Sequence, residues 1–156
     1  MNMNIVLYQP EIPQNTGNIA RTCALTETNL HLIKPLGFSL DEKQLKRAGL
    51  DYWELVKVSI YDSFEQFLEK NPEAKLYILT TKATKFYHQI SYDADAFLMF
   101  GKETAGIPPE IHESHAENRF RIPMRNHQKA RSLNLSNAVN IVLYEALRQH
   151  QFKGLI

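Results

Sequence analysis

Cysteine and long apolar runs are scarce in this sequence, and each absence excludes a class of protein. Cys23 is the single cysteine among 156 residues, so an internal disulfide cannot form and the chain suits a reducing compartment such as the cytoplasm. No apolar run approaches the roughly 20 residues that a membrane-spanning helix needs. The opening residues, Met1 to Asn4, carry no basic side chain. We therefore expect no membrane span and no signal peptide.

An excess of charge and the common catalytic signatures are also missing. Lysine and arginine number 18 against 17 aspartate and glutamate, a net charge of +1, which favours no class of partner. The sequence has no phosphate-binding Gly-x-x-x-x-Gly-Lys-[Ser/Thr], no Gly-x-Gly-x-x-Gly and no Gly-x-Ser-x-Gly. His112 and His115 could bind a metal, but no cysteine or acidic cluster supports them, so we expect a surface helix there and no metal. Cys23 is expected to be a small core residue.

Strands and helices alternate along the chain. Apolar residues make up 44% of it, which suffices for the core of a single domain over residues 1–156. This alternation predicts an α/β fold, a mostly parallel sheet flanked by helices. The predicted strands cover residues 4–8, 30–33, 56–58, 76–79, 97–100 and 120–122. Helices are predicted at 15–26, at 41–47, after Asp62 or Ser63, at Pro108 and Pro109, and at 134–149.

Three loops between these elements hold more polar residues than a turn requires. They cover residues 10–22, 98–108 and 131–140, and each runs from an apolar segment toward a helix. In the last, Ser132, Asn134, Ser136 and Asn137 surround the start of a helix that needs only one cap. Open α/β sheets place ligands in the loops beyond the carboxyl ends of their strands. We therefore expect a site here, with one or two of the four side chains serving as caps.

Arg21 and Glu103 each allow a functional and a structural interpretation. Arg21 lies three residues after Asn18, on the same face of the predicted helix, where it could hold a phosphate or carboxylate in two hydrogen bonds. It could equally form a structural ion pair with Glu11 or Glu103. Glu103 could in turn do no more than accept N–H groups of its loop and hold the turn.

Two groups of basic residues stand out locally. The first, Lys43, Lys46 and Arg47, is expected to be a solvated face. The second lies beside the last polar loop, has few acids between its members, and is expected to contact RNA. It consists of Arg119, Arg121, Arg125, Lys129 and Arg131.

The motifs together resemble the SpoU branch of the SPOUT superfamily of RNA methyltransferases. Within it the chain is similar to the small, single-domain tRNA (cytidine/uridine-2′-O-)-methyltransferases of the TrmL (YibK) type. The similarity extends over essentially the whole chain, because all the motifs occur in order at this length. The segments that carry it are residues 5–8, 10–18, 31–38, 79–82, 100–104 and 132–137.

This resemblance implies a fold, a cofactor and partners. The fold would be the SPOUT fold, with a C-terminal deep trefoil knot. S-adenosyl-L-methionine would be the methyl donor, S-adenosylhomocysteine the product, and no metal would be needed. The acceptor would be the ribose 2′-hydroxyl of the wobble nucleotide, C or modified U, of leucine tRNAs, bound through the anticodon arm. A cytoplasmic homodimer is implied, with the first and last helices packed across its interface.

The resemblance also implies roles for individual residues. Arg21 matches the family's catalytic arginine, and because a guanidinium stays protonated in proteins we expect it to orient or polarise the ribose and phosphate. Asn18, Glu103, Ser136 and Asn137 would position Arg21 or the hydroxyl. The donor would be bound by Leu79, Thr80, Phe100, Gly101, Gly106, Ile122, Met124, Ser132 and Leu133, in large part through the backbone.

One departure from the family and two alternative functions are open at this stage. Glu27 stands where a glycine is common in the family, which predicts an altered turn into the second strand. The chain could instead methylate riboses of a different tRNA or of ribosomal RNA. It could also be a non-catalytic RNA-binding or ribosome-assembly protein.

Overall fold

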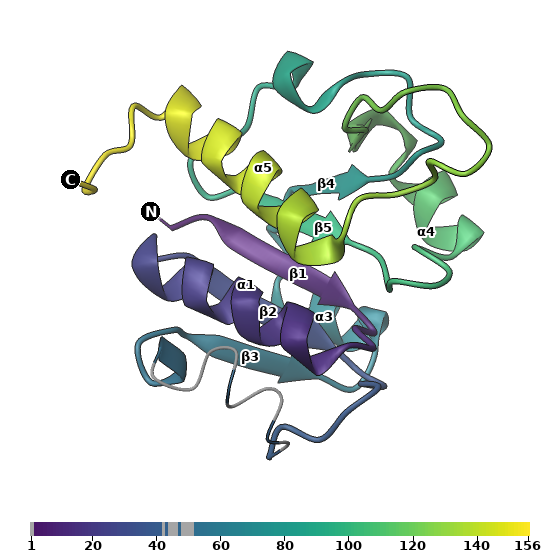
Figure 1. Ribbon diagram of the computed structural model, residues 1–156. Helices are drawn as coiled ribbons and strands as arrows, with labels where there is room; N and C mark the ends of the chain where they lie inside the picture. Colours follow the sequence, from purple (N-terminus) through teal and green to yellow (C-terminus); the bar gives the residue numbers. More distant parts are fainter. Residues whose placement is uncertain (1, 42, 44–46, 48–51) are drawn as a thin grey trace.

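A parallel sheet forms the centre of the protein in the computed structural model, which describes residues 2–41, 43, 47 and 52–156 (Figure 1). Its strands lie in the order β3-β2-β1-β5-β4-β6, and every neighbouring pair is parallel. The predicted α/β fold with a parallel sheet is therefore confirmed. The strands are β1 (Asn4–Tyr8), β2 (Asn29–Ile33), β3 (Val58–Tyr61), β4 (Leu76–Leu79), β5 (Phe97–Phe100) and β6 (Arg119–Phe120).

Helices cover both faces of the sheet (Figure 1). The long helices α1 (Pro13–Leu25) and α5 (Leu135–Gln149) lie side by side on one face. The short helices α3 (Phe64–Lys70) and α4 (Pro109–Ser114) pack on the other face, against the second buried cluster. Two single-turn 3₁₀ helices, η1 (Tyr87–Gln89) and η2 (Ala116–Asn118), flank the edge at β6.

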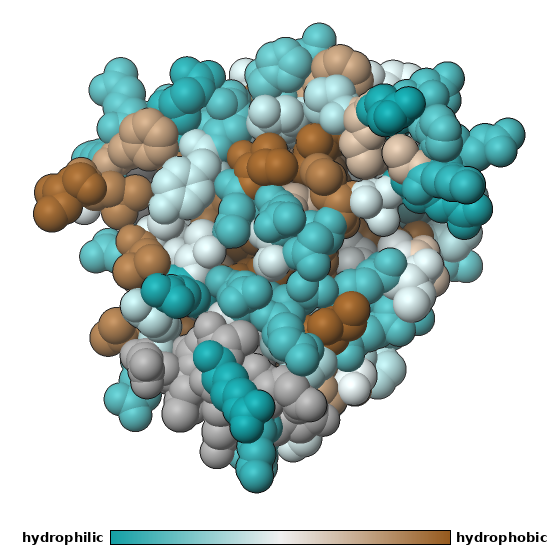
Figure 2. Space-filling model, in the orientation of Figure 1, coloured by the Kyte–Doolittle hydropathy of each residue, from teal (hydrophilic) through white to brown (hydrophobic). Residues whose placement is uncertain are grey.

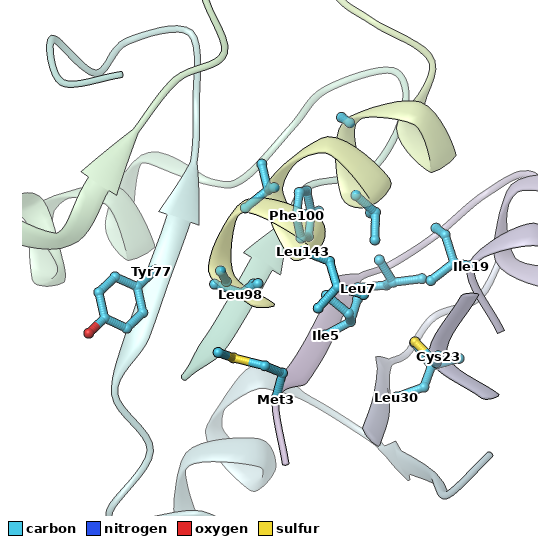
Figure 3. Close-up of a cluster of buried hydrophobic side chains, with 14 of the residues drawn as sticks. Met3, Ile5, Leu7, Ile19, Cys23, Leu30, Tyr77, Leu98, Phe100 and Leu143 are labelled. Carbon is cyan, nitrogen blue, oxygen red and sulfur yellow. The ribbon is translucent and has the colours of Figure 1, made fainter. Parts of the chain in front are cut away.

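The core follows the two-residue period of the strands. In β1, Ile5 and Leu7 point toward α1 and α5, whereas Val6 points toward the opposite layer. Figure 3 shows Ile5 and Leu7 packed against Ile19 of α1 and Leu143 of α5. The apolar face predicted for the last helix is confirmed, because the following residues are all buried: Leu135, Ala138, Val139, Val142 and Ala146.

Two strands differ from the sequence prediction by two residues or more at one end. The strand predicted at 56–58 is β3 at Val58–Tyr61, since Val56 is buried in a turn in which its N–H is bonded to the Trp53 carbonyl. The strand predicted at 120–122 is β6, which ends at Phe120, although Ile122 is also buried. In both places, a residue that is buried outside a strand made the sequence pattern resemble a strand. The short helix predicted at 41–47 lies largely outside the described residues.

The turn after α1 accommodates Glu27 with the backbone that a glycine would adopt. Glu27 has a φ of 53°, in the left-handed region, and the Thr28 N–H bonds the Cys23 carbonyl across it at 2.9 Å. This is the usual glycine-terminated end of a helix, formed here without a glycine. From this turn the chain enters β2 at Asn29.

A buried polar network ties β1, β2 and β3 together. The Asn4 Oδ1 atom accepts from the Asn29 side chain, so the His31 Nε2 atom, 2.9 Å away, donates to the same oxygen. The neutral ring then accepts the Tyr61 hydroxyl proton at Nδ1, 2.8 Å away. Burial, together with the positive charge of the nearby Lys57, lowers the pKa of His31 to about 4. The imidazole is therefore a neutral structural group at neutral pH.

Candidate functional site

The three polar loops meet at the carboxyl ends of β1 and β5, as the sequence predicts. Glu103, in the loop after β5, accepts the Glu11 N–H at 2.9 Å and the Ile12 N–H at 3.1 Å through one carboxylate oxygen. These amides open α1, whose own N-cap residue, Ile12, makes no side-chain cap. An anion placed there also complements the positive end of the helix dipole. Glu103 thus caps a helix that begins about 90 residues earlier in the chain.

The Glu11 side chain in turn accepts hydrogen bonds from the loop that carries Glu103. Its Oε1 atom accepts the Thr104 hydroxyl at 2.7 Å and the Thr104 N–H at 3.1 Å. These hydrogen bonds lower the pKa of Glu11, whereas burial raises the pKa of Glu103 above its usual value. The first and second polar loops are therefore clamped together by two carboxylates with different environments.

Asn134 joins the third loop to the first. Its Oδ1 atom accepts the Ser136 and Asn137 N–H groups, so Asn134, one of the four candidate caps, is the N-cap of α5. Its Nδ2 atom donates to Asn15 Oδ1 at 3.0 Å, and Asn15 lies in the first turn of α1. One side chain thus fixes the amino ends of both long helices to each other.

A cavity of about 570 Å³ lies between these loops. Its walls come from the ends of β4 and β5, the loop between Glu103 and Ile107, and the segment between β6 and α5. All nine residues predicted to bind the donor line it: Leu79, Thr80, Phe100, Gly101, Gly106, Ile122, Met124, Ser132 and Leu133. Their binding role itself stays a prediction; the structure adds that they face one space.

Gly101 is required by a close backbone approach within this wall. A β-carbon built on Gly101 would lie 2.3 Å from the carbonyl carbon of Gly106, and Gly106 has a φ of 68°. The two glycines close a tight loop through the paired backbone groups of Lys102 and Gly106. The loop thereby presents backbone rather than side chain to the cavity at this point.

His112 also lines the cavity, and sequence reasoning did not assign it there. The prediction of an exposed helix is wrong for this residue, since His112 is buried and its Nδ1 atom has no partner among the described residues. Burial lowers its pKa, and Lys82 and Arg119 lower it further. It therefore contributes a neutral imidazole to the wall. The sequence signal for its burial was the presence of two apolar residues nearby in the chain, Ile107 and Ile111, both of which are buried as well.

Of the predicted catalytic residues, Glu103 lines the cavity, whereas Asn18, Arg21, Ser136 and Asn137 are not among the residues of its wall. Asn18 and Arg21 are exposed on α1, and the Arg21 guanidinium lies 4.8 Å from the ring centroid of Tyr52. Among the described residues it makes no ion pair with Glu11 or Glu103. Ser136 is buried and donates to Asn134 at 2.6 Å, whereas the Asn137 side chain is exposed.

The basic segment predicted to contact RNA borders the same cavity. Arg121 and Arg131 line it, with Arg121 donating to the Thr81 carbonyl and Arg131 to the Gln128 carbonyl. In Figure 2, hydrophilic groups cover the part of the surface where Figure 1 places the loop between β6 and α5. The RNA contact itself stays a prediction.

Several other chemistries find no support in the described part of the chain. Cys23 is fully buried, which confirms it as a core residue, and burial raises the pKa of its thiol to about 12. The described residues hold no group of three histidine, cysteine or acidic side chains arranged for a metal ion. None of their helices is both long and apolar enough to span a membrane.

Comparisons with known proteins agree with this architecture. The model of the SpoU rRNA Methylase family matches residues 2–144. A tRNA (cytidine(34)-2′-O)-methyltransferase of Escherichia coli K12 is 49% identical over 155 residues, with 99% of this chain and 98% of the relative covered. A structure described as giving insight into 2-OH methylation of C/U34 on tRNA has a TM-score of 0.88, 43% identity and 96% coverage of both chains. An AdoMet-bound rRNA methyltransferase of Sinorhizobium meliloti shares the fold at 23% identity, with a TM-score of 0.84, 94% of this chain and 56% of its own covered.

Proposed function

Because the chain belongs to the SpoU rRNA Methylase family, we propose that it methylates the ribose 2′-hydroxyl of nucleotide 34, C or modified U, of leucine tRNAs. The methyl donor is S-adenosyl-L-methionine, and the chain acts as one domain in the cytoplasm. The nucleotide number follows the names of relatives such as the Escherichia coli protein. The leucine specificity and the C-terminal trefoil knot follow the family resemblance.

The cavity is the observation that carries this proposal. Its apolar walls, from Leu79, Ile122 and Leu133, suit a flat base, while the Gly101 loop and Thr80 supply polar backbone and hydroxyl groups for a ribose. When bound, S-adenosyl-L-methionine supplies a methyl group on a positively charged sulfur. Its transfer to the ribose 2′-oxygen would release S-adenosylhomocysteine, and the hydroxyl proton would pass to water, because the Arg21 guanidinium stays protonated.

The protein's part in this reaction is alignment. Arg21 stays protonated, so it orients the ribose and the adjacent phosphate rather than taking the proton. Asn18, one turn earlier on the same exposed face, is placed to assist. Holding two reactants in line can lower the barrier by roughly 7–11 kcal/mol when the geometry is ideal.

A homodimer would place this exposed face of α1 against a second copy. Leu25 of α1 is 58% exposed, and Ile141 and Tyr144 of α5 are 37% and 44% exposed on the neighbouring helix. Apolar side chains on two adjacent helices form a patch suited to burial in an interface. Sedimentation of Tyr144→Glu should show monomers where the unchanged chain sediments as a dimer.

The test of the function is nucleoside mass spectrometry of leucine tRNA incubated with the purified protein and S-adenosyl-L-methionine. New 2′-O-methylcytidine or 2′-O-methyluridine at position 34 is expected. Arg21→Ala should abolish turnover and keep most donor affinity, because Arg21 lies outside the cavity wall. If the donor binds but no tRNA gains a methyl group, the proposal is wrong. Ribosomal RNA and a non-catalytic RNA-binding role are then the next candidates.

A further inference from the structure

A second hollow adjoins the donor cavity. It has a volume of about 480 Å³ and lies between the loop after β4 and the segment that leads into β6. Lys82 lines both spaces, so they lie on either side of this side chain. The residues that line the second hollow are Lys82, Ala83, Thr84, Lys85, Ala116, Glu117, Asn118 and Arg119.

Positive charge dominates this hollow. Lys82, Lys85 and Arg119 contribute three cations, and Glu117 is the acid among the lining residues. The ion pairs that the structure describes lie elsewhere and involve none of these three cations. Arg119 is held by its Nε donating to the Ala116 carbonyl at 3.3 Å, which leaves its terminal nitrogens for another partner. The hollow therefore suits an anion.

Aromatic rings continue the same segment beyond the cations. Phe86 is 37% exposed, and its ring centroid lies 6.1 Å from that of His88, which is also exposed. The Phe86 ring thus lies at the surface directly after Lys85, next to a cation. Together, residues 82–88 place two ammonium groups, and after them three aromatic rings, along one edge of the protein.

The backbone of this segment is fixed to the edge of the sheet. The Arg121 N–H bonds the Lys85 carbonyl at 2.9 Å, and the Tyr87 N–H bonds the Arg121 carbonyl at 2.8 Å. The Gln89 side chain accepts the Phe86 N–H at 2.8 Å. The cations and rings are thus presented from a held backbone, so a ligand would not have to order it.

We propose that this surface, Lys82 to His88 with Arg119, binds single-stranded RNA on its way to the donor cavity. Phosphates would lie at Lys85 and Arg119, and an unpaired base would stack on Phe86. Cations that track a backbone, interleaved with rings that stack on bases, are the common means of holding single strands. The inference rests on the proposed function, which supplies an RNA substrate, and names where that RNA runs.

The test compares Lys85→Ala and Phe86→Ala with Lys70→Ala. Lys70 is an exposed lysine at the end of α3, near the amino ends of the strands and far from the cavity. Lys82 is not changed, because it also lines the donor cavity. Binding of leucine tRNA is measured by fluorescence anisotropy over a series of salt concentrations, and donor binding is measured by calorimetry as a check on the fold.

Each variant has a distinct expected result. Lys85→Ala should weaken binding and reduce the slope of log affinity against log salt by about 1, as loss of one phosphate contact predicts. Phe86→Ala should weaken binding at least about fivefold with the slope unchanged, because stacking releases no counterions. Lys70→Ala should bind as the unchanged chain does, and all three should keep their donor affinity.

Two results would overturn the inference in distinguishable ways. If the unchanged chain binds and methylates leucine tRNA while Lys85→Ala and Phe86→Ala bind it equally well, the RNA runs elsewhere and the proposed function stands. If the unchanged chain binds the donor but no RNA, the proposed function fails and this inference fails with it.

Discussion

Glu103 accepts the backbone N–H of Glu11 at 2.9 Å, while Glu11 accepts the N–H of Thr104, the residue after Glu103, at 3.1 Å. Each carboxylate therefore holds the loop that carries the other. Removing Glu103 would leave two amides at the start of α1 without their acceptor.

We expect Glu103→Ala to lower the free energy of unfolding by about 1–3 kcal/mol, the usual cost of leaving partly buried donors unpaired. Urea unfolding measures this cost. Glu113→Ala serves as the control, because Glu113 is an exposed acid on α4 with no described partner, and its loss should change little. Equal effects of the two changes would mean that the Glu103 hydrogen bonds contribute nothing beyond surface charge.

The close approach of Gly101 to Gly106 in the cavity wall leads to a second prediction. A methyl group on Gly101 would strike the Gly106 backbone, which must shift into the cavity or away from it. We expect Gly101→Ala to weaken donor binding about tenfold or more, in line with the 1–3 kcal/mol that overpacking costs. Gly106→Ala is the comparison, because a β-carbon at Gly106 meets no atom within 4 Å. Its main effect should be the backbone strain of a non-glycine residue at positive φ. Calorimetry that finds the two variants equal would exclude the steric explanation.

The turn at Glu27 predicts a stabilising change. A non-glycine residue in the left-handed region costs roughly 1 kcal/mol, and glycine adopts it readily. Glu27→Gly should therefore raise the free energy of unfolding by about 0.5–1 kcal/mol. Glu27→Ala removes the side chain but keeps the β-carbon, so it should gain nothing. A gain in the alanine variant would assign the effect to charge instead of backbone.

The buried His31 predicts a pH dependence of stability. Its pKa is about 4 in the folded protein, below the roughly 6.5 of an unfolded histidine, so the unfolded chain binds the proton more tightly. This residue costs no stability above pH 6.5, and it destabilises the fold progressively as the pH falls toward 4, by about 3 kcal/mol in all.

The measurement is urea unfolding at several pH values for the unchanged chain and for His31→Phe. The phenyl ring would join Phe67 and Phe97, whose rings already lie near His31. The difference between the two stability curves isolates His31 from His112, whose pKa is also lowered. A difference that is flat between pH 6.5 and 4 would show that His31 titrates normally.

Sequence reasoning located the central strands because their burial is complete. Leu7 and Phe100 are fully buried in β1 and β5, and short, continuous apolar runs like these are typical of buried strands. The range predicted for the edge strand β3 was displaced, because Ile60 in the strand is exposed while Val56, before the strand, is buried. The order β3-β2-β1-β5-β4-β6 depends on long-range packing, which no local pattern encodes.

The candidate site shows the same division. The polar surplus around Asn134 correctly indicated a convergence of loops, because several unneeded cap residues are a local signal. The partner of Glu103 was not local: the carboxylate reaches amides that lie about 90 residues away in the chain. His112 was missed because burial of a polar residue on a short helix cannot be told from exposure by spacing alone.

The parallel sheet has a practical consequence for attaching probes to this protein. Every strand points the same way, so the loops of the site gather at one end of the sheet. The connections that precede β4 and β5, at residues 71–75 and 91–95, lie at the other end, and Glu73 and Asp95 there are exposed. A fluorophore or a surface tether fixed at Glu73 would leave the cavity and the second hollow untouched, so turnover could be followed on immobilised protein.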